Sequence, residues 1–158
     1  MLKELFDMPS GILEDLHQDH EEISDLIEQL LQAETVEERM PLFKEMAGKL
    51  LAHARAEQTV LYRKMEKSPD EETRGFAYEG GNEHRIVEQQ LEEMSRTRNK
   101  ASEQWTAKAT VLRELINHHV NEEEDTGFTC ARREFDSMAL EKLGEQFRRQ
   151  KEKLLTEA

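Results

Sequence analysis

Four histidines with a nearly repeated spacing constrain the fold of this chain more than any other feature. His53 follows His20 by 33 residues, and His119 follows His84 by 35 residues. The two halves are offset by 64 residues from His20 to His84 and by 66 residues from His53 to His119. Two copies of a segment of about 65 residues predict two helical hairpins that contribute the same set of groups.

The second histidine of each half is followed four residues later by a glutamate, which gives the pairs His53 with Glu57 and His119 with Glu123. Side chains four residues apart on a helix lie one turn apart on the same face, so each pair can reach one ion or bridge two adjacent ions. Glutamate is frequent in this sequence, so a single pair would mean little. The same pair in the same register of both halves indicates a shared site.

His20 and His84 stand in matching stripes of apolar and small residues. Measured from each histidine, the stripe residues lie at offsets of −7, −4, +3, +7 and +10. They are Leu13, Leu16, Ile23, Ile27 and Leu30 around His20, and Ala77, Gly80, Val87, Leu91 and Met94 around His84. A histidine on such a stripe must find a partner or lose its hydration uncompensated. The stripes support the internal symmetry independently of the candidate ligands.

The apolar periodicity predicts long helices separated by short connections. Thr35 with Glu38 and Ser68 with Glu71 are candidate capping boxes at the starts of the second and third helices. Gly127 is expected to interrupt the fourth helix. The predicted helices cover about 11–33, from 35 through at least 61, about 68–100, about 105–124 and about 136–156.

Together these features predict an all-α fold, an antiparallel up-down four-helix bundle with an additional C-terminal helix. In such a bundle, one stripe from each helix meets at a common axis, where metals are commonly bound. We expect a single domain over residues 1–158, with the core bundle at about 11–134 and the C-terminal helix at about 136–156.

Composition excludes several classes of function. The net charge of −13 would repel nucleic acid and anionic membrane surfaces, so we expect neither as a partner. The longest apolar runs are too short to span a membrane. Residues 1–10 lack the apolar stretch of a secretory signal peptide, and the single cysteine, Cys130, fits a reducing compartment. A cytoplasmic location is therefore expected.

The fourth helix offers two candidate pairs, because His118 also has a glutamate four residues later. Tyr62 lies nine residues after His53, and Phe128 lies nine residues after His119. This match favours His119 as the ligand and makes His118 an outer or surface residue.

Other side chains near the stripes have two readings each. His17 falls off the buried stripe and is interpreted as facing solvent; the other reading is a ligand, because Glu14-x-x-His17 is a single copy of the ferritin-type spacing. Glu88, four residues after His84, is either a further carboxylate of the site or a solvated side chain. Tyr62 and Tyr78 either pack in the core or reach the site by hydrogen bonds.

Imidazole and carboxylate donors suit Fe, Zn, Mn or Cu, and a set of this size can hold more than one ion. The alternative is four satisfied core histidines with surface glutamates. The candidate metal ligands are His20, His53, Glu57, His84, His119 and Glu123.

The order of these motifs resembles the hemerythrin-like (HHE cation-binding) domain family over about residues 11–134. The motifs are Asp19-His20, His53-x-x-x-Glu57, Glu83-His84 and His118-His119-x-x-x-Glu123. The resemblance implies a hemerythrin-like bundle with two non-heme Fe ions held by the six candidate ligands. It also implies that both glutamates bridge the ions, with an oxo or hydroxo group completing the bridge.

The chain departs from the pattern of that family in three places. Glu88 stands where oxygen-carrying hemerythrins have a second histidine one turn after the third-helix ligand. Gln58 follows Glu57 where relatives often have a second acid, and Arg63 and Thr129 replace a common proline. The first departure removes a nitrogen ligand, which weakens the case for reversible oxygen carriage and leaves room for a ligand to react.

The resemblance favours a protein that binds or senses O2, NO or peroxide in an oxidative or nitrosative stress response. The expected ligand is a small diatomic molecule or peroxide. The alternatives are a peroxide- or O2-consuming di-iron enzyme of the catalase or oxidase type, an iron homeostasis protein, and a metal-free interaction bundle.

Overall fold

The computed structural model describes residues 8–157, so most of the segment considered for a signal peptide lies outside the described residues. Within this range the chain is helical and contains no strand, which confirms the all-α prediction. The long helices are α2 (Ile12–Gln32), α3 (Val36–Glu57), α5 (Glu71–Arg96), α6 (Glu103–Glu122) and α8 (Ser137–Glu157). The shorter elements are η1 (Gln58–Tyr62), α4 (Arg63–Met65), η2 (Glu123–Gly127) and α7 (Phe128–Glu134).

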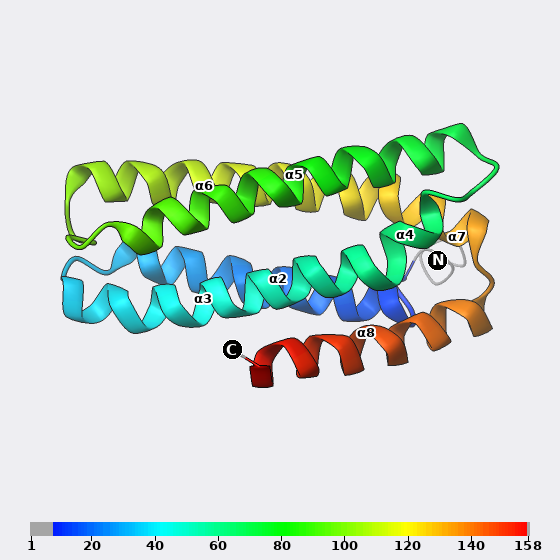
Figure 1. Cartoon of the computed structure of the whole chain (residues 1–158), viewed down its shortest axis with the longest axis horizontal. Helices are drawn as coiled ribbons and strands as arrows, with labels where there is room; N and C mark the ends of the chain where they lie inside the picture. Colours follow the sequence, from blue (N-terminus) through cyan, green and yellow to red (C-terminus); the bar gives the residue numbers. More distant parts are fainter. Residues whose placement is uncertain (1–7, 158) are drawn as a thin grey trace.

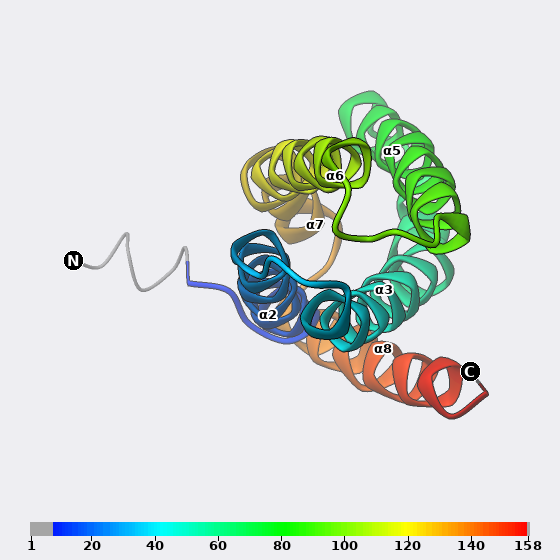
Figure 2. The same cartoon turned by 90° about the vertical axis from the view of Figure 1, so that its left-hand side faces the viewer.

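Helices α2, α3, α5 and α6 lie lengthwise beside one another (Figure 1). Seen from the end, they surround a common centre, and α8 lies outside them against α2 and α3 (Figure 2). None of the described helices is long and apolar enough to cross a bilayer.

The apolar interior is divided into two clusters along the bundle. One cluster includes the start of α2, the matching aromatic residues Tyr62 and Phe128 of the two halves, and the inner face of α8. The other includes the second half of α2, the first half of α3, and the facing parts of α5 and α6 around Trp105. His20 and His84 lie between apolar residues of the two clusters, so the candidate ligands form a polar layer in an otherwise apolar core.

The start of α3 confirms Thr35 as its N-cap, because its hydroxyl accepts a hydrogen bond from the Glu38 amide at 3.2 Å. The predicted cap of the third helix is wrong. Asp70 caps α5 by accepting from the Thr73 amide at 3.2 Å, since its carboxylate lies directly before the first helical residue. Ser68 instead accepts from the Asp70 amide at 3.0 Å and donates to Glu134 at 2.6 Å.

Gly127 does not interrupt the fourth helical segment. The α-helix continues through the π-helical turn η2 into α7, and α3 likewise continues through the π-helical turn η1 into α4. A Cβ atom at Gly127 would collide with the ring of Phe76, so this glycine permits close packing of α5 against η2. Each half of the chain therefore has its own π-helical turn, which lies next to Glu57 in the first half and begins at Glu123 in the second.

Arg39 ties together the connections at one end of the bundle. Its guanidinium donates to the carbonyl oxygens of Ala33 at 2.8 Å and Lys100 at 2.7 Å, and to the hydroxyl of Thr106 at 2.7 Å. It also lies 5.6 Å from the centre of the Trp105 ring. A buried arginine that satisfies backbone carbonyls from two connections holds the two helical hairpins together at this end.

Gly80 allows the ring of Tyr62 to pack directly against the backbone of α5. A Cβ atom at position 80 would lie 2.7 Å from the Tyr62 ring. Tyr62 is fully buried, and its ring packs against the rings of Phe76 and His84. Gly75, on the same helix, has no atom within 4 Å of its Cβ position.

We predict opposite effects for the same substitution at these two glycines. Gly80→Ala should lower the free energy of unfolding by about 1–3 kcal/mol, because the added methyl group overpacks the core. Gly75→Ala should raise it by about 0.5–1 kcal/mol through helix propensity alone. Urea denaturation of the two variants measures both effects. A Gly80→Ala variant as stable as Gly75→Ala would contradict the close packing of Tyr62.

Candidate metal site

The structure brings all six predicted ligands together in the polar layer. Helix α2 contributes His20, α5 contributes His84, and α6 contributes His119. Helix α3 contributes both His53 and its last residue, Glu57, whereas Glu123 is the first residue of η2. All four main helices of the bundle therefore reach the site. That these groups bind metal stays a prediction from this geometry.

The ligand atoms form two adjacent groups. The first consists of His20, His53 and Glu123, and the second of Glu57, His84 and His119; within each group the atoms lie within 4.8 Å of one another. In the first group, Nε2 of His20 is 3.0 Å from Oε1 of Glu123. In the second, Nε2 of His84 is 3.0 Å from Oε1 of Glu57 and 3.1 Å from Nε2 of His119.

Each glutamate also lies next to the other group. Oε1 of Glu57 is 3.9 Å from Nε2 of His53, which belongs to the first group. Oε2 of Glu123 is 3.6 Å from Nε2 of His119, which belongs to the second group. Two carboxylates placed between two sets of imidazoles are suited to bridge a pair of cations.

Most of the inward-facing atoms are buried close to one another without forming a hydrogen bond. Glu57 is fully buried and Glu123 is 1% exposed. Both oxygens of Glu57, Oε1 of Glu123, and Nε2 of His20 and His53 are buried without a hydrogen bond. A buried carboxylate is costly unless it is paired or coordinates a metal. These orphaned nitrogen and oxygen donors therefore fit a pair of divalent or trivalent transition-metal ions.

Both glutamates sit where the helix changes from α to π. Glu57 directly precedes η1, and Glu123 begins η2. A π-helical turn widens the backbone by one residue and is often found at functional sites. Sequence reasoning missed these turns, although the matching nine-residue spacing from His53 to Tyr62 and from His119 to Phe128 reflects them.

A second layer of carboxylates holds three of the four imidazole rings from behind. Asp19 lies 2.9 Å from Nδ1 of His53, and Glu83 lies 2.8 Å from Nδ1 of His119. Glu124 lies 2.7 Å from Nδ1 of His20. Such contacts fix the tautomer and orientation of a ring, so that its Nε2 faces inward. Sequence reasoning gave these three acids no such role.

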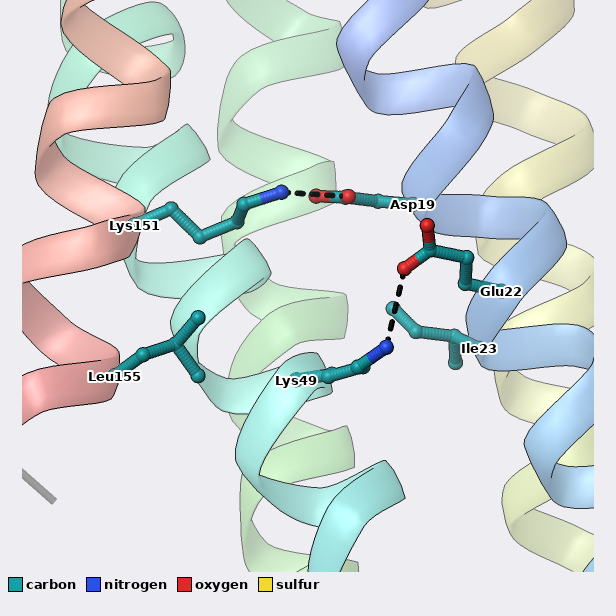
Figure 3. A pocket seen from close by; sticks show the side chains of 6 residues that line it. All are labelled: Asp19, Glu22, Ile23, Lys49, Lys151 and Leu155. Atoms are coloured by element: carbon teal, nitrogen blue, oxygen red, sulfur yellow. Dashed lines mark hydrogen bonds and ion pairs between the residues drawn. The ribbon is translucent and has the colours of Figure 1, made fainter.

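The first of these carboxylates is shared with the C-terminal helix. Lys151 of α8 donates to Asp19 at 2.7 Å (Figure 3). A neighbouring ion pair joins Lys49 and Glu22 at 3.3 Å. Both ion pairs line a cavity of about 210 Å³ between α2, α3 and α8. Asp19 is thus held from both sides, by an imidazole and by an ammonium group.

His17 and His118 contact the second layer and not the ligand groups. Nδ1 of His17 is 2.8 Å from Glu124, and Nε2 of His118 is 3.1 Å from Glu83. The side chain of His17 is 39% exposed and that of His118 is 62% exposed. The interpretation of His17 as purely solvent-facing therefore misses its bond to Glu124.

Glu88 and Tyr78 do not reach the site. Glu88 pairs with Arg55 at the surface, as its solvated reading expected, because its side chain points away from the polar layer. Tyr78 is 56% exposed, so neither reading of Tyr78, core packing or a hydrogen bond to the site, holds.

Tyr62 does reach the site. Its hydroxyl donates to Oε2 of Glu123, and its ring stacks on His84 with 5.1 Å between ring centres. Burial, together with the negative charges of Glu123 and Glu57, raises the pKa of Tyr62 well above its usual range. Tyr62 therefore stays a neutral donor, which orients one of the two buried carboxylates.

A small apolar cavity adjoins the four histidines. Its volume is about 20 Å³, and no polar surface of its lining is accessible. The histidines form one side of it, and the rest is lined by Ile23, Leu50, Ala54, Val87, Ile116 and Val120. A space of this size admits a molecule of one or two non-hydrogen atoms and excludes larger substrates.

Without a bound cation, protons compensate the buried carboxylates. Burial acts to lower the pKa of His20, but its contacts with Glu123 and Glu124 raise that pKa to about 10. Burial likewise opposes protonation of His119, but Glu57 and Glu83 raise its pKa to about 10. Burial acts to raise the pKa of Glu57, yet the adjacent His119 and His84 hold it well below its usual range.

We predict that the metal-free protein loses stability as the pH rises from 6.5 to 9.5. The unfolded pKa of histidine is about 6.5. Because the folded pKa values of His20 and His119 are about 10, the protonated rings stabilise the fold fully below pH 6.5 and progressively less above it. Urea midpoints of chelator-treated protein across this range measure the loss.

The matched variants for this measurement are His119→Gln and His118→Gln. His119→Gln should flatten the dependence of stability on pH, whereas His118→Gln should leave it unchanged, because the His118 ring is largely exposed. A metal-free protein whose midpoint stays constant or rises between pH 6.5 and 9.5 would show that the buried carboxylates are compensated in another way.

The chain was also compared with known proteins. Searches of curated proteins and of solved structures returned no match. The family model described as Hemerythrin HHE cation binding domain matches residues 11–131, which cover the four main helices and all six candidate ligands. With this match over most of its length, the chain belongs to the hemerythrin HHE cation-binding family.

Proposed function

We propose that this chain is a non-heme di-iron protein that binds or senses O2, NO or peroxide in an oxidative or nitrosative stress response. Its bundle would have the antiparallel up-down arrangement of a hemerythrin-like fold, within one domain in the cytoplasm. The observation that carries the proposal is the position of the apolar cavity of about 20 Å³, which is lined by the same four histidines that surround the buried carboxylates of Glu57 and Glu123.

The donor set supports iron as the bound metal. The imidazole nitrogens are borderline donors and the carboxylate oxygens are hard donors, and together they suit iron in either common oxidation state. When bound, a pair of iron ions would supply a redox-active centre for a small oxidising ligand. The six residues would be its ligands, with Glu57 and Glu123 between the two ions.

The surrounding residues would control what reaches the iron pair. Tyr62 keeps Glu123 oriented, and the second-layer carboxylates keep three of the four histidine rings turned inward. The apolar lining of the cavity disfavours charged molecules, since a charge placed there would lose its hydration. Neutral O2, NO and hydrogen peroxide are small enough and uncharged.

The position of Glu88 favours a centre that reacts with its ligand over one that only carries oxygen. It occupies the place one turn after His84, and it points outward to Arg55. The turn after His84 therefore supplies no further donor at Glu88. The His84 side of the site would then leave room for an external ligand.

Purified protein expressed with ample iron should contain about two iron ions per chain. It should also show near-ultraviolet charge-transfer absorption that changes when O2, NO or peroxide is added. His119→Ala should lose most of the iron and this absorption, whereas the neighbouring variant His118→Ala should keep both. Metal analysis that finds no iron in the unsubstituted protein would reject the proposal.

The second candidate function is a peroxide- or O2-consuming enzyme. It is favoured by a polar, solvent-open cavity of about 290 Å³ that has His84 in its lining and lies between α3 and α5. This cavity would give a substrate repeated access to the His84 side of the site. Iron homeostasis, the third possibility, would require binding of far more than two ions.

Peroxide turnover separates these functions. An enzyme should consume many equivalents of hydrogen peroxide per iron pair, and Glu57→Ala should abolish consumption by removing a bridging carboxylate. A binding or sensing protein should change its absorption once, in proportion to the peroxide added, without further consumption. Oxygen-electrode and absorption measurements on the same sample distinguish the two outcomes.

A further inference from the structure

The second-layer contacts follow a rule that repeats between the halves. The residue before the histidine of α2, Asp19, contacts His53 on α3. The residue before the histidine of α5, Glu83, contacts His119 on α6 in the same way. Each hairpin therefore uses the same sequence position to hold the histidine of its second helix.

A second kind of contact, from the residue after the ligand glutamate, is formed in one half only. Glu124, the residue after the ligand Glu123, contacts Nδ1 of His20 at 2.7 Å. The equivalent residue in the other half follows Glu57 and is Gln58, and the equivalent histidine is His84. By the same symmetry, Gln58 would contact His84. Gln58 carries an amide, however, where Glu124 carries a carboxylate.

His84 and Gln58 do not form the equivalent bond. Nδ1 of His84 is buried without a hydrogen-bond partner, and so is Oε1 of Gln58. The amide nitrogen of Gln58 donates instead to Glu66 at 3.2 Å. The His84 ring is positioned by stacking on Tyr62, with 3° between the ring planes. His84 is thus the one candidate histidine ligand without a carboxylate behind it among the described residues.

The other outer contacts are balanced between the halves. Each of the three second-layer carboxylates has one further partner: Lys151 for Asp19, His118 for Glu83, and His17 for Glu124. Among the contacts behind the four imidazole rings, the halves therefore differ in the group behind His84. The His84 side chain is also the more exposed, at 12% compared with 4% for His20.

A carboxylate behind a metal-bound imidazole strengthens that imidazole as a ligand and holds its orientation, and losing such a partner typically weakens metal binding by about 10–100-fold. Building on the proposed function, we infer that the two metal positions are unequal and that Gln58 sets the difference. The position formed by His20, His53 and Glu123 binds its ion tightly. The position formed by Glu57, His84 and His119 binds more weakly and exchanges first.

Titration of the metal-free chain with Co²⁺, followed by visible absorption, tests this inference. Unsubstituted protein should bind two ions in two steps whose dissociation constants differ by at least about tenfold. Gln58→Glu should strengthen the weaker step by about 10–100-fold, because it supplies the carboxylate that His84 lacks. Glu124→Gln, its mirror image, should weaken the tighter step by a similar factor.

Glu88→Gln is the matched control, since Glu88 lines the same cavity as Gln58 but pairs with Arg55 at the surface. It should leave both steps unchanged. Thermal melts of the metal-free variants identify any variant that fails to fold, and the remaining member of the mirror pair then carries the test.

The outcomes separate this inference from the proposed function. Two equal steps in the unsubstituted protein would overturn the inference while leaving a two-metal site intact. An unchanged weaker step in folded Gln58→Glu would overturn it as well. If no Co²⁺ binds and iron is also absent from the purified protein, the proposed function itself fails.

Discussion

The structure depends on two carboxylates that are buried between four imidazoles in an apolar bundle. Glu57 and Glu123 are shielded from water, so their negative charge must be balanced inside the protein. Protons on His20 and His119 can provide that balance, and so can bound cations. The same arrangement of charges could accept either protons or metal ions, and metal binding at this site would exchange protons for ions. Tyr62 and the second-layer acids serve to hold this arrangement in place.

Helix geometry explains how both hairpins form the same contact between a carboxylate and a histidine. A carboxylate next to a histidine in sequence points to a different side of its own helix and so reaches the histidine of the neighbouring helix. Asp19 and Glu83 both do so, which ties each hairpin together through its ligand. The π-helical turns then let a single helix present its glutamate inward and the following aromatic residue to the core. Gly80 and Gly127 provide the space that this packing needs.

Much of this arrangement was predictable from periodicity, because a stripe of fixed spacing defines which face of a helix is buried. The stripe around His20 was predicted, and it is buried as expected. Contacts that depend on the separation of helices were not predictable. Arg39 looks like a surface charge in the sequence, and only the meeting of two connections gives it carbonyl partners. The role of Ser68 was missed for the same reason, since Glu134 lies far from it along the chain.

The C-terminal helix α8 packs on the core of the protein but lies outside the region that matches the family. Phe147 of α8 lies in the same apolar cluster as Leu13 and contacts the ring of His53, with 5.8 Å between ring centres. The matched region ends at residue 131, before α8 begins. A fragment cut at that point would keep every candidate ligand but would expose the outer side of α2 and α3 to water. The apolar core of this chain therefore includes a helix that lies outside the segment matched by its family.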